Sequence, residues 1–304
     1  MGQPGPWTQD LILAEYKFTN PWRASDRVSQ FLIKDVIYDG TDVTAEDQLA
    51  RIVLFRLFSK PSTWRAIEGN LGPVRAATLD DSRLPALLEH LQSRGPIYTS
   101  AFILCANKAY GYDRKYLNHL ALVNEMVGRG ALARAVACAR KLGEVYEALC
   151  AYPLIGPFMC YQLAIDINYS ELTDFSEDEF TVPGPGAARG IEKVFPGTPA
   201  REHAGIIHQM VEEQEAACEA HGITPPNLFG QRRLRAIDCQ NLFCELDKYA
   251  RVRFPDLRSN RTQIKAMFTP SPEPLELFYP PKWGVENLPS AGFEGAAELV
   301  PAVA

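Results

Sequence analysis

The stretch LCAYPLIGP, residues 149–157, stands between two helical patterns. Helical spacing of apolar residues precedes it from Ala131 to Cys150, and an apolar stretch follows from Phe158 to Ile167. A tight turn with Gly156, and a second helix that opens at Pro157, predict a helix-hairpin-helix motif over about 149–168. Such a hairpin points the amides of a helix N-terminus outward, where a DNA phosphate can bind. We therefore expect a DNA contact at Gly156, the alternative being an ordinary turn between two helices.

Outward from this hairpin, helical periodicity covers most of the chain. Ser25 or Asp26 can cap a helix that runs to Tyr38, and Thr44 can cap the next one. Further helices are expected at 84–92, 118–127, 131–150 and 203–221. Strict alternation of apolar and polar residues is confined to short runs, so a large sheet is not expected. The pattern predicts an all-α fold, with residues 1–285 as one helical domain, or two helical lobes, and 286–304 as a disordered tail.

Composition narrows the class of protein. The chain has 304 residues, of which 46% are hydrophobic, and this is enough for a sizeable core. It contains no apolar run of the roughly 18 residues that a membrane span needs, and no leader pattern precedes Trp7. We expect a cytoplasmic protein without membrane partners. The seven cysteines show no metal-binding spacing, which predicts reduced thiols and no metal site.

Charge is unevenly distributed along the chain. The net charge is −6, whereas DNA-binding proteins are more often basic. Between Gln231 and Lys265, however, nine Lys and Arg residues stand against four acids. This segment is either a strip that contacts phosphates or the solvated face of a helix. Within it we take Arg251 as a candidate DNA contact.

One polar constellation lies in the same segment. If residues 238–251 form a helix, the side chains of Asp238, Asn241, Glu245 and Lys248 share one stripe. Lysine can meet the carboxylate of an amino-acid substrate, and a carboxylate can take a proton from its ammonium group. We therefore expect Asp238, Glu245 and Lys248 to be catalytic, with Gln240 and Asn241 in substrate binding. The alternative is a surface face held by salt bridges.

A second polar constellation lies near the start of the chain, where Phe18 and Trp22 flank Asn20, Arg23, Asp26 and Arg27. Arginines bind phosphates in a forked geometry, and aromatic rings stack on extruded bases. The alternative is helix capping with one buried Arg–Asp pair.

A third segment, 110–116, mixes basic and aromatic residues, so Arg114 and Lys115 are further candidate DNA contacts. For His119, close behind, a structural role is favoured over a catalytic one.

Some twenty residues after Gly156 comes the acidic segment DFSED, residues 174–178. This arrangement resembles the helix-hairpin-helix base-excision glycosylases, in which a glycine-rich hairpin is followed at that distance by a catalytic aspartate. The resemblance implies a catalytic role for Asp178, with Asp174 as the second choice. The chain departs from that pattern at Leu154, which replaces the first hairpin glycine, and in the residues after Asp178. The alternative is that Asp174 or Ser176 caps a helix.

A closer resemblance covers nearly the whole chain. It rests on PWT (6–8), YKFTN (16–20), RASDR (23–27), NYSELTDFS (168–176), VPGPG (182–186), DCQNLFCELDKY (238–249) and YPPKW (279–283). These blocks, in this order, resemble the glycosylase-like helical proteins of thymine hypermodification in DNA. That group includes the alpha-glutamyl/putrescinyl thymine pyrophosphorylases and the helical domain of 5-hydroxymethyluracil DNA kinase.

The resemblance implies an amino acid:DNA transferase with a helix-hairpin-helix glycosylase-like fold. Such an enzyme displaces the phosphate or pyrophosphate of an activated 5-hydroxymethyluracil in double-stranded DNA by an amine such as glycine. The modification protects bacteriophage DNA from host restriction. Arg23 and Arg27 would hold the leaving group, and Asp178 or the Asp238/Glu245 pair would deprotonate the amine. The chemistry requires no cofactor, although Mg²⁺ on a pyrophosphate is compatible with it.

The sequence also bears on three other functions: a kinase, a DNA glycosylase and a non-catalytic subunit. Kinase activity of this chain alone is not expected, because the sequence lacks the glycine-rich P-loop with Gly-Lys-Ser/Thr that cradles phosphates. A true DNA glycosylase would use Asp178 to cut the base–sugar bond. A non-catalytic subunit would present DNA to a separate 5-hydroxymethyluracil DNA kinase.

Overall fold

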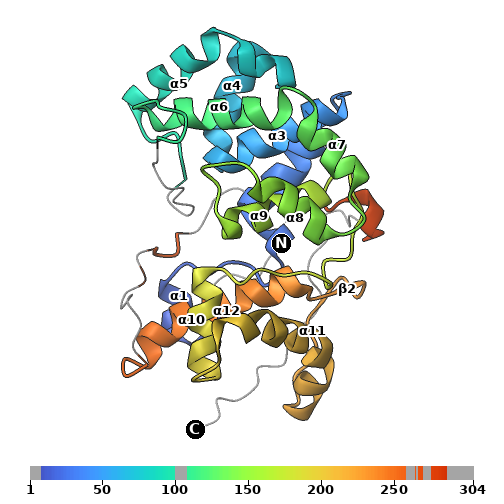
Figure 1. Ribbon diagram of the computed structural model, residues 1–304. Helices are drawn as coiled ribbons and strands as arrows, with labels where there is room; N and C mark the ends of the chain where they lie inside the picture. Colours follow the sequence, from blue (N-terminus) through green and yellow to red (C-terminus); the bar gives the residue numbers. More distant parts are fainter. Residues whose placement is uncertain (1–7, 100–107, 258–263, 265, 270–274, 286–304) are drawn as a thin grey trace.

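The computed structural model describes residues 8–99, 108–257, 264, 266–269 and 275–285. The helices of this part of the chain form two groups that meet at a seam, an upper lobe and a lower lobe (Figure 1). The only strands described are two residues long, so the all-α prediction is confirmed. The predicted tail, 286–304, lies outside the described residues.

The upper lobe is built from consecutive helices. They are α2 (Arg27–Phe31), the π-helical turn η2 (Leu32–Ile37), α3 (Ala45–Phe58), α4 (Pro61–Leu71), η3 (Ala76–Asp80), α5 (Arg83–Arg94), α6 (Lys115–Val127), α7 (Ala131–Cys138), α8 (Leu142–Cys150) and α9 (Pro157–Asn168). Their apolar faces form one large core, in which Leu49, Ile52 and Leu163 are fully buried.

The lower lobe combines the start of the described chain with residues 185–253. It holds α1 (Leu11–Glu15), α10 (Pro185–Val194), η4 (Ala200–Glu202), α11 (His203–Ala220), the antiparallel pair β1 (Asn227–Leu228) and β2 (Arg232–Arg233), and α12 (Ala236–Arg253). A second, smaller core joins α10, α11 and α12. The short helix η1 (Arg23–Ser25) lies between α1 and α2 in sequence, and η5 (Pro281–Trp283) is the last element described. Both contact residues of the two lobes.

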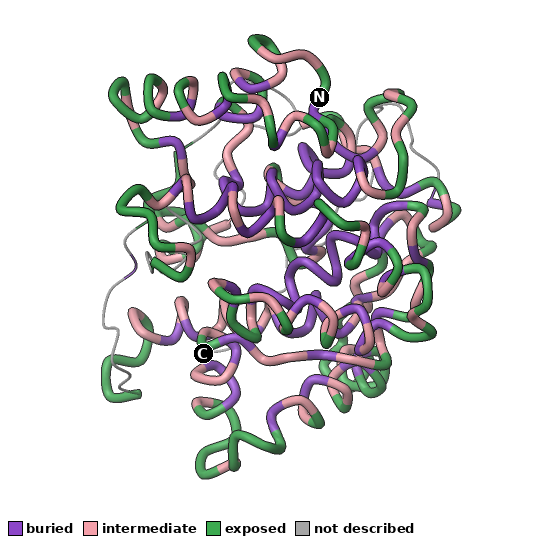
Figure 2. Tube along the Cα trace, turned by 45° about the horizontal axis from the view of Figure 1, so that its top comes forward, coloured by how far each residue is buried: buried purple, intermediate pink, exposed green. Residues whose placement is uncertain are grey.

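Burial follows this division. Buried residues are concentrated in the helices that run through the middle of the molecule, whereas the outer helices are exposed on one side (Figure 2). Trp22 packs against both cores, directly before η1. The lobes therefore share a continuous interior at η1.

Two capping predictions have different outcomes. Thr44 caps α3 in a reciprocal box with Asp47, as the sequence predicts. Asp26 occupies the N-cap of α2, but its side chain makes no capping bond and accepts the amide of Asn20 at 3.3 Å instead. The helix expected from Ser25 to Tyr38 is accordingly divided into a 3₁₀, an α and a π segment.

The helix expected over 131–150 is also divided. It ends at Cys138, and Ala139 and Lys141 have extended backbone before α8 begins at Leu142. Both halves keep the predicted apolar face, with Leu132 and Val145 buried. The break turns α8 so that it packs against α9.

Helices α8 and α9 form the predicted pair joined by a short turn. Leu154, which stands where the glycosylase pattern has its first glycine, adopts a left-handed φ of 72°. Gly156 is the N-cap of α9 with φ −90°, and Pro157 is the first helical residue. Leu154 thus has a backbone conformation that is common for glycine and rare for leucine. A glycosylase-like arrangement of the whole fold stays a prediction.

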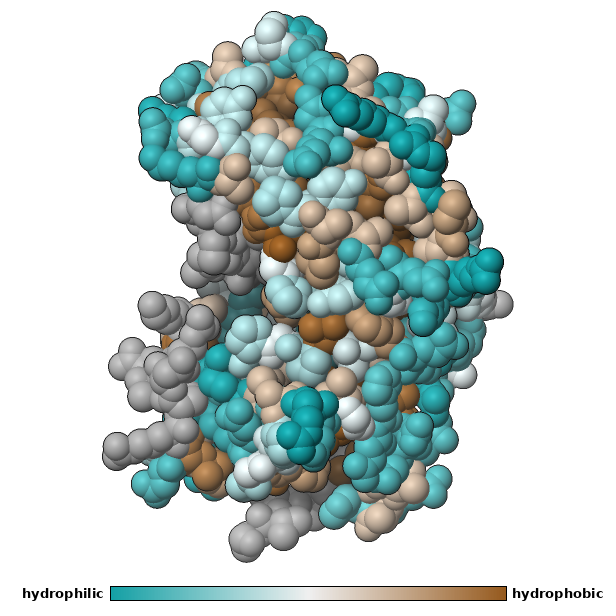
Figure 3. Space-filling view, in the orientation of Figure 1, coloured by the Kyte–Doolittle hydropathy of each residue, from teal (hydrophilic) through white to brown (hydrophobic). Residues whose placement is uncertain are grey.

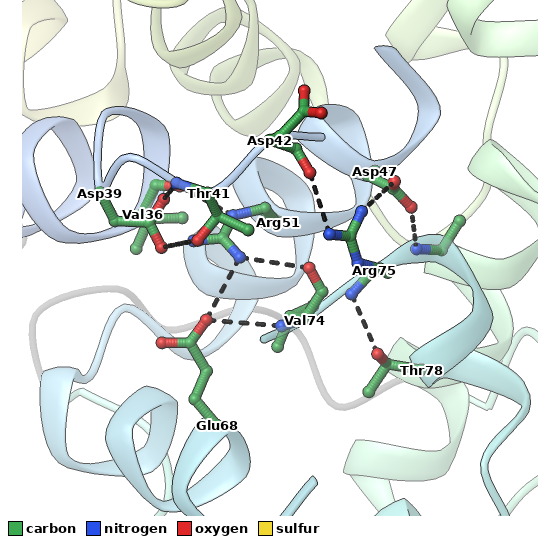
Figure 4. A network of polar contacts seen from close by, with 11 residues as sticks. Val36, Asp39, Thr41, Asp42, Asp47, Arg51, Glu68, Val74, Arg75 and Thr78 are labelled. Carbon is green, nitrogen blue, oxygen red and sulfur yellow. Dashed lines mark hydrogen bonds and ion pairs between the residues drawn. The ribbon is translucent and has the colours of Figure 1, made fainter. Parts of the chain in front are cut away.

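A closed polar network ties the upper lobe together (Figure 4). The fully buried Arg51 of α3 donates to the carbonyl of Val36 at 2.9 Å, and to Asp39 and Glu68 at 2.5 and 3.2 Å. It also donates to the carbonyl of Val74 at 3.2 Å. Beside it, Arg75 pairs with Asp47 at 3.1 Å. The network fixes the loop before α3 and the loop after α4.

The segment 275–285 returns from the far end of the chain to the upper lobe. The hydroxyls of Tyr279 and Ser25 lie 2.8 Å apart, and the amide of Phe278 donates to Gln30 at 2.7 Å. Nearby, an isolated antiparallel bridge joins Tyr16 to Met267. Among the helices described here, none combines the length and apolar character that crossing a bilayer requires.

Candidate functional site

A buried polar cluster occupies the seam between the lobes. We call it the seam cluster and define it by Arg23, Gln162, Asp166, Glu177, Arg232 and Asp238. It draws on η1, on α9, on the loop after α9, on β2 and on the first turn of α12. The face of the molecule seen in the space-filling view mixes hydrophilic and hydrophobic residues over both lobes (Figure 3).

Arg23 is the centre of this cluster and is 4% exposed. Its Nε donates to Gln162 Oε1 at 2.8 Å, and its Nη2 donates to Asp166 Oδ1 at 2.8 Å. Its backbone amide donates to Asp238 Oδ1 at 2.7 Å. Arg23 therefore connects α9 of the upper lobe with α12 of the lower lobe.

Asp166 is held by two arginines. Besides Arg23, the buried Arg56 of α3 donates through Nη2 to Asp166 Oδ1 at 2.8 Å and through Nε to the other carboxylate oxygen. Arg23 Nη1 donates to the hydroxyl of Tyr169 at 3.0 Å. A fully buried carboxylate is stable only with such partners, so this part of the cluster is rigid.

Asp238 is buried at the third position of α12. Its Oδ2 accepts the amide of Arg235, the N-cap residue of α12, at 3.0 Å. Burial, reinforced by the negative charge of Glu177, raises the pKa of Asp238 to about 7. A carboxyl group with this pKa can exchange a proton near neutral pH.

Glu177 lies beside Asp238 and pairs with Arg232 at 2.8 Å. The guanidinium of Arg232 stacks over the ring of Trp283 at 3.6 Å. Trp283 also meets the ring of Tyr169 edge-on at a centroid distance of 5.6 Å. The charged cluster thus borders on aromatic rings, and Tyr279 stacks on Trp283 at a centroid distance of 6.1 Å.

Several polar atoms around the seam have no hydrogen-bond partner among the described residues. They are Thr19 Oγ1, Trp22 Nε1, Gln162 Nε2, Asp178 Oδ1 and Gln240 Oε1. A buried polar atom without a partner costs about 1–3 kcal/mol, so few are kept without a reason. Of these atoms, Gln162 Nε2 belongs to the seam cluster itself, and it marks the seam as a site where a polar ligand can bind.

Asp178, the carboxylate expected from the glycosylase pattern, lies at the edge of this cluster. It pairs with Arg235 at 2.5 Å and lies 3.8 Å from Arg233. Its backbone amide donates to Ser176 Oγ, and the segment around it is a loop. Asp174 and Ser176 therefore do not cap a helix there.

The predicted stripe on α12 exists but is internally paired. Glu245 forms an ion pair with Lys248 and accepts the amide of Thr19 at 3.1 Å. Lys248 also donates to the carbonyl of Lys17 at 3.3 Å and lies over the ring of Phe18. Next to this stripe, Gln240 is buried and donates to Cys244 Sγ at 3.3 Å, and Asn241 is half-buried. The pairing favours a role in fixing the chain start to α12.

The basic segment is mostly neutralised. Arg251 pairs at 3.0 Å with Asp247, which is fully buried. Asp247 also binds Arg189 at 3.0 Å and Lys193. This leaves little of the Arg251 guanidinium for a phosphate. Arg258, Arg261 and Lys265 lie outside the described residues.

The other predicted residues are dispersed. Asn20, Asp26 and Arg27 lie at the rim of the seam, and burial raises the pKa of Asp26. Arg114 lies in the upper lobe, 3.7 Å from Glu89, and Lys115 covers the ring of Tyr98.

His119 is buried against Tyr98 with its pKa lowered to about 3 by that burial, which supports the structural role. Gly156 is exposed at the hairpin.

Sequence reasoning missed Gln162, Asp166 and Glu177 as site residues. It considered Trp283 only as a residue that closes a pocket or pins the tail to the core, and Arg232 only as part of the basic segment. Gln162 and Asp166 are four apart on α9, so they share a face, but both lie in an apolar stretch that predicted only core. Glu177 precedes Asp178, and only the fold shows which of the two points inward.

A pocket in the upper lobe gives less indication of a ligand than the seam cluster does. It has a volume of about 930 Å³ and lies between η3, α6 and the start of α7. Its polar groups are paired, since Asn124 donates to Asp80 at 2.7 Å and Tyr110 binds Glu125. Within the described part of the chain, no three His, Cys, Asp or Glu side chains gather as a metal site would require.

Comparison with known proteins identifies the family. A 5-hmdU DNA kinase of Bacillus phage SP10 is 27% identical over 263 residues, which cover 82% of this chain and 41% of that kinase. The chain thus spans less than half the length of this curated relative. No solved structure matches. The profile of the family described as "5-hmdU DNA kinase, helical domain" matches residues 1–259, and the chain belongs to this family.

Proposed function

We propose that this chain binds a 5-hydroxymethyluracil base of DNA in the seam and replaces its activated hydroxyl by an amine. The family supports a place in thymine hypermodification. The amine acceptor would be the phosphorylated or pyrophosphorylated base in double-stranded DNA, and the donor a free amino acid or related amine. The base would leave the stack, because its 5-substituent reacts most easily there.

The observation that carries this proposal is Asp238, a buried carboxyl group whose pKa is raised to about 7. At neutral pH it is present in both protonation states, so it can accept the proton that an ammonium group must lose before attack. The nitrogen then forms a bond to the exocyclic carbon while the carbon–oxygen bond breaks, and phosphate leaves with the bonding electrons. Glu177, beside Asp238, would stabilise positive charge on that carbon.

The arginines divide between two roles. Arg23, which we expected to hold the leaving group, is occupied by Gln162, Asp166 and Tyr169 and acts as a positioning residue. Arg27 at the rim, and Arg232 and Arg235 beside the carboxylates, are better placed to meet a phosphate. The proposed step needs no redox cofactor, and Mg²⁺ would act only on the leaving group.

Mass analysis of nucleosides tests this function. The protein is incubated with DNA that carries phosphorylated or pyrophosphorylated 5-hydroxymethyluracil and a pool of amino acids and polyamines, and the DNA is then digested. We expect a nucleoside that has gained one amine and lost the phosphate, and loss of this product in Asp238→Asn. The exposed Glu179→Gln, close by in sequence, is the control and should keep activity. Free base or abasic sites would instead show a glycosylase.

A second candidate function is presentation of the base to a kinase. It is favoured by the relative, in which the matched region makes up 41% of a 5-hmdU DNA kinase. In that case DNA that carries 5-hydroxymethyluracil would bind, but no nucleoside would change in mass without an added kinase. Repeating the assay with a 5-hydroxymethyluracil DNA kinase and ATP separates the two functions.

A further inference from the structure

We propose that Gln162 selects a pyrimidine with a carbonyl group at position 4 and rejects one with an amino group there. This inference rests on one part of the proposed function, namely that a base enters the seam. It assigns to one side chain the distinction between uracil-type and cytosine-type bases.

Gln162 combines two properties that a base-reading side chain needs. It is 2% exposed, in the middle of α9, and thus held in one place. Its Oε1 accepts from Arg23, while its Nε2 has no partner among the described residues. The amide oxygen is therefore held by Arg23, and the N–H groups of Nε2 are left to donate to a ligand.

The orientation of this amide is fixed by its surroundings. An arginine can only donate hydrogen bonds, so the group facing Arg23 Nε must be the amide oxygen. Arg23 cannot turn away, because Asp166 and Tyr169 hold its other nitrogens. Asp166 is in turn fixed by Arg56. A flip of Gln162 would set N–H against N–H in a buried place, and the cost of two unpaired donors opposes it.

This fixed polarity has a chemical consequence. The O4 of uracil accepts hydrogen bonds, whereas the N4 amino group of cytosine donates them. A locked donor at Gln162 matches the first and opposes the second. Because a site with buried polar groups rejects a mismatched ligand strongly, we expect at least about a tenfold preference.

Equilibrium binding of oligonucleotides tests the assignment. Single strands that carry one 5-hydroxymethyluracil or one 5-hydroxymethylcytosine are compared by fluorescence anisotropy, so that base-pairing energy does not contribute. The whole chain should bind the uracil strand at least about ten times more tightly. In Gln162→Glu the preference should vanish or reverse, because a carboxylate accepts from the amino group of cytosine.

Two further variants keep the test decisive. Gln162→Met has a similar shape and neither donor nor acceptor, so both strands should bind with nearly equal affinity. Gln48→Glu, which alters another buried glutamine with an unpartnered Nε2 on α3, controls for a buried charge and should keep the preference. Thermal melts identify the variants that are folded.

The outcomes separate the two proposals. If both Gln162 variants are folded and retain the preference of the parent chain, the assignment is overturned while base binding stands. If the parent chain binds the two strands equally, and no more tightly than a strand with unmodified thymine, base reading in the seam fails, and the assignment with it.

Discussion

The Arg51 network and the seam cluster are both built around a buried arginine that donates to carboxylates, and they differ in completeness. Arg51 meets backbone carbonyls and two acids at the ends of loops, and none of the side chains in its network has an unpartnered buried atom among the described residues. Around Arg23 the arginine itself is satisfied, but Gln162 and nearby side chains are not.

Whether all buried polar atoms have partners distinguishes a structural network from a network that can bind a ligand. A closed network gains its full energy from folding, because every polar group that leaves water finds a partner. In a network with unpartnered polar groups, the missing hydrogen bonds form only when a ligand binds, so part of the favourable energy belongs to binding. The acids differ as well. Asp47 in the first network has a lowered pKa because backbone amides and Arg75 donate to it, whereas burial raises the pKa of Asp238 in the second.

The largest effect is expected when the closed network is broken. Arg51→Met leaves Asp39, Glu68 and two carbonyls without their donor, so the free energy of unfolding should fall by about 3–5 kcal/mol. Urea denaturation measures this change. The preference between uracil-type and cytosine-type oligonucleotides should survive in the folded fraction. A loss below about 1 kcal/mol would show that the network is not structural.

The second effect concerns pH. The pKa of Asp238 is raised from near 4 to about 7, so the folded state binds a proton there that the unfolded state has released. This contribution to stability is full below pH 4 and is lost as pH rises to about 7. At about 1.4 kcal/mol per unit of pKa, the loss is up to about 4 kcal/mol. Asp238→Asn should remove this dependence from a series of denaturation curves, and an unchanged slope would refute the raised pKa.

A smaller effect should follow from Glu177→Gln. The charge of Glu177 is the main electrostatic cause of the raised pKa of Asp238 after burial itself. Without it, the midpoint of the pH-dependent stability should move down by about one pH unit. Glu179→Gln, an exposed residue in the same loop, should leave the midpoint in place. Equal midpoints in the two variants would contradict the coupling.

The smallest effect is expected outside both networks. Gly156 has φ −90°, and an added Cβ would meet no atom within 4 Å, so Gly156→Ala should change the unfolding free energy by less than about 0.5 kcal/mol. The contrasting variant is Gly190→Ala, whose Cβ would lie 2.0 Å from the carbonyl oxygen of Phe243. Reduced DNA affinity in Gly156→Ala at unchanged stability would support the predicted hairpin contact.

The sequence predicted the helices better than it predicted where they break. Periodicity identified α3, α6 and α11, and Thr44 was correctly placed as a cap. It failed for the capping bond of Asp26 and at residues 139–141, because contacts outside the helix in question decide the structure there. Asp26 accepts the amide of Asn20, and the interruption after α7 lets α8 pack on α9.

For the site, the sequence named Arg23 and Asp238 in two separate constellations, and the fold joins them although 215 positions separate them. It could not predict the role of Gln162, because the sequence of an apolar helix does not show which distant residue a polar side chain in it will contact. Equally, the excess of basic residues in 231–265 predicted an exposed strip, whereas buried carboxylates such as Asp247 take up several of these charges.

The contact between Ser25 and Tyr279 closes a loop of 254 residues, and it bears on the order in which the protein folds. Local helices and the α8–α9 pair can form as soon as their residues leave the ribosome. The fully buried Tyr279, however, completes the upper core only after the residues up to this position have been synthesised. Until then the pocket for its ring stays open and Gln30 lacks the amide of Phe278. The upper core of the nascent chain therefore stays incomplete until the segment 275–285 has been made.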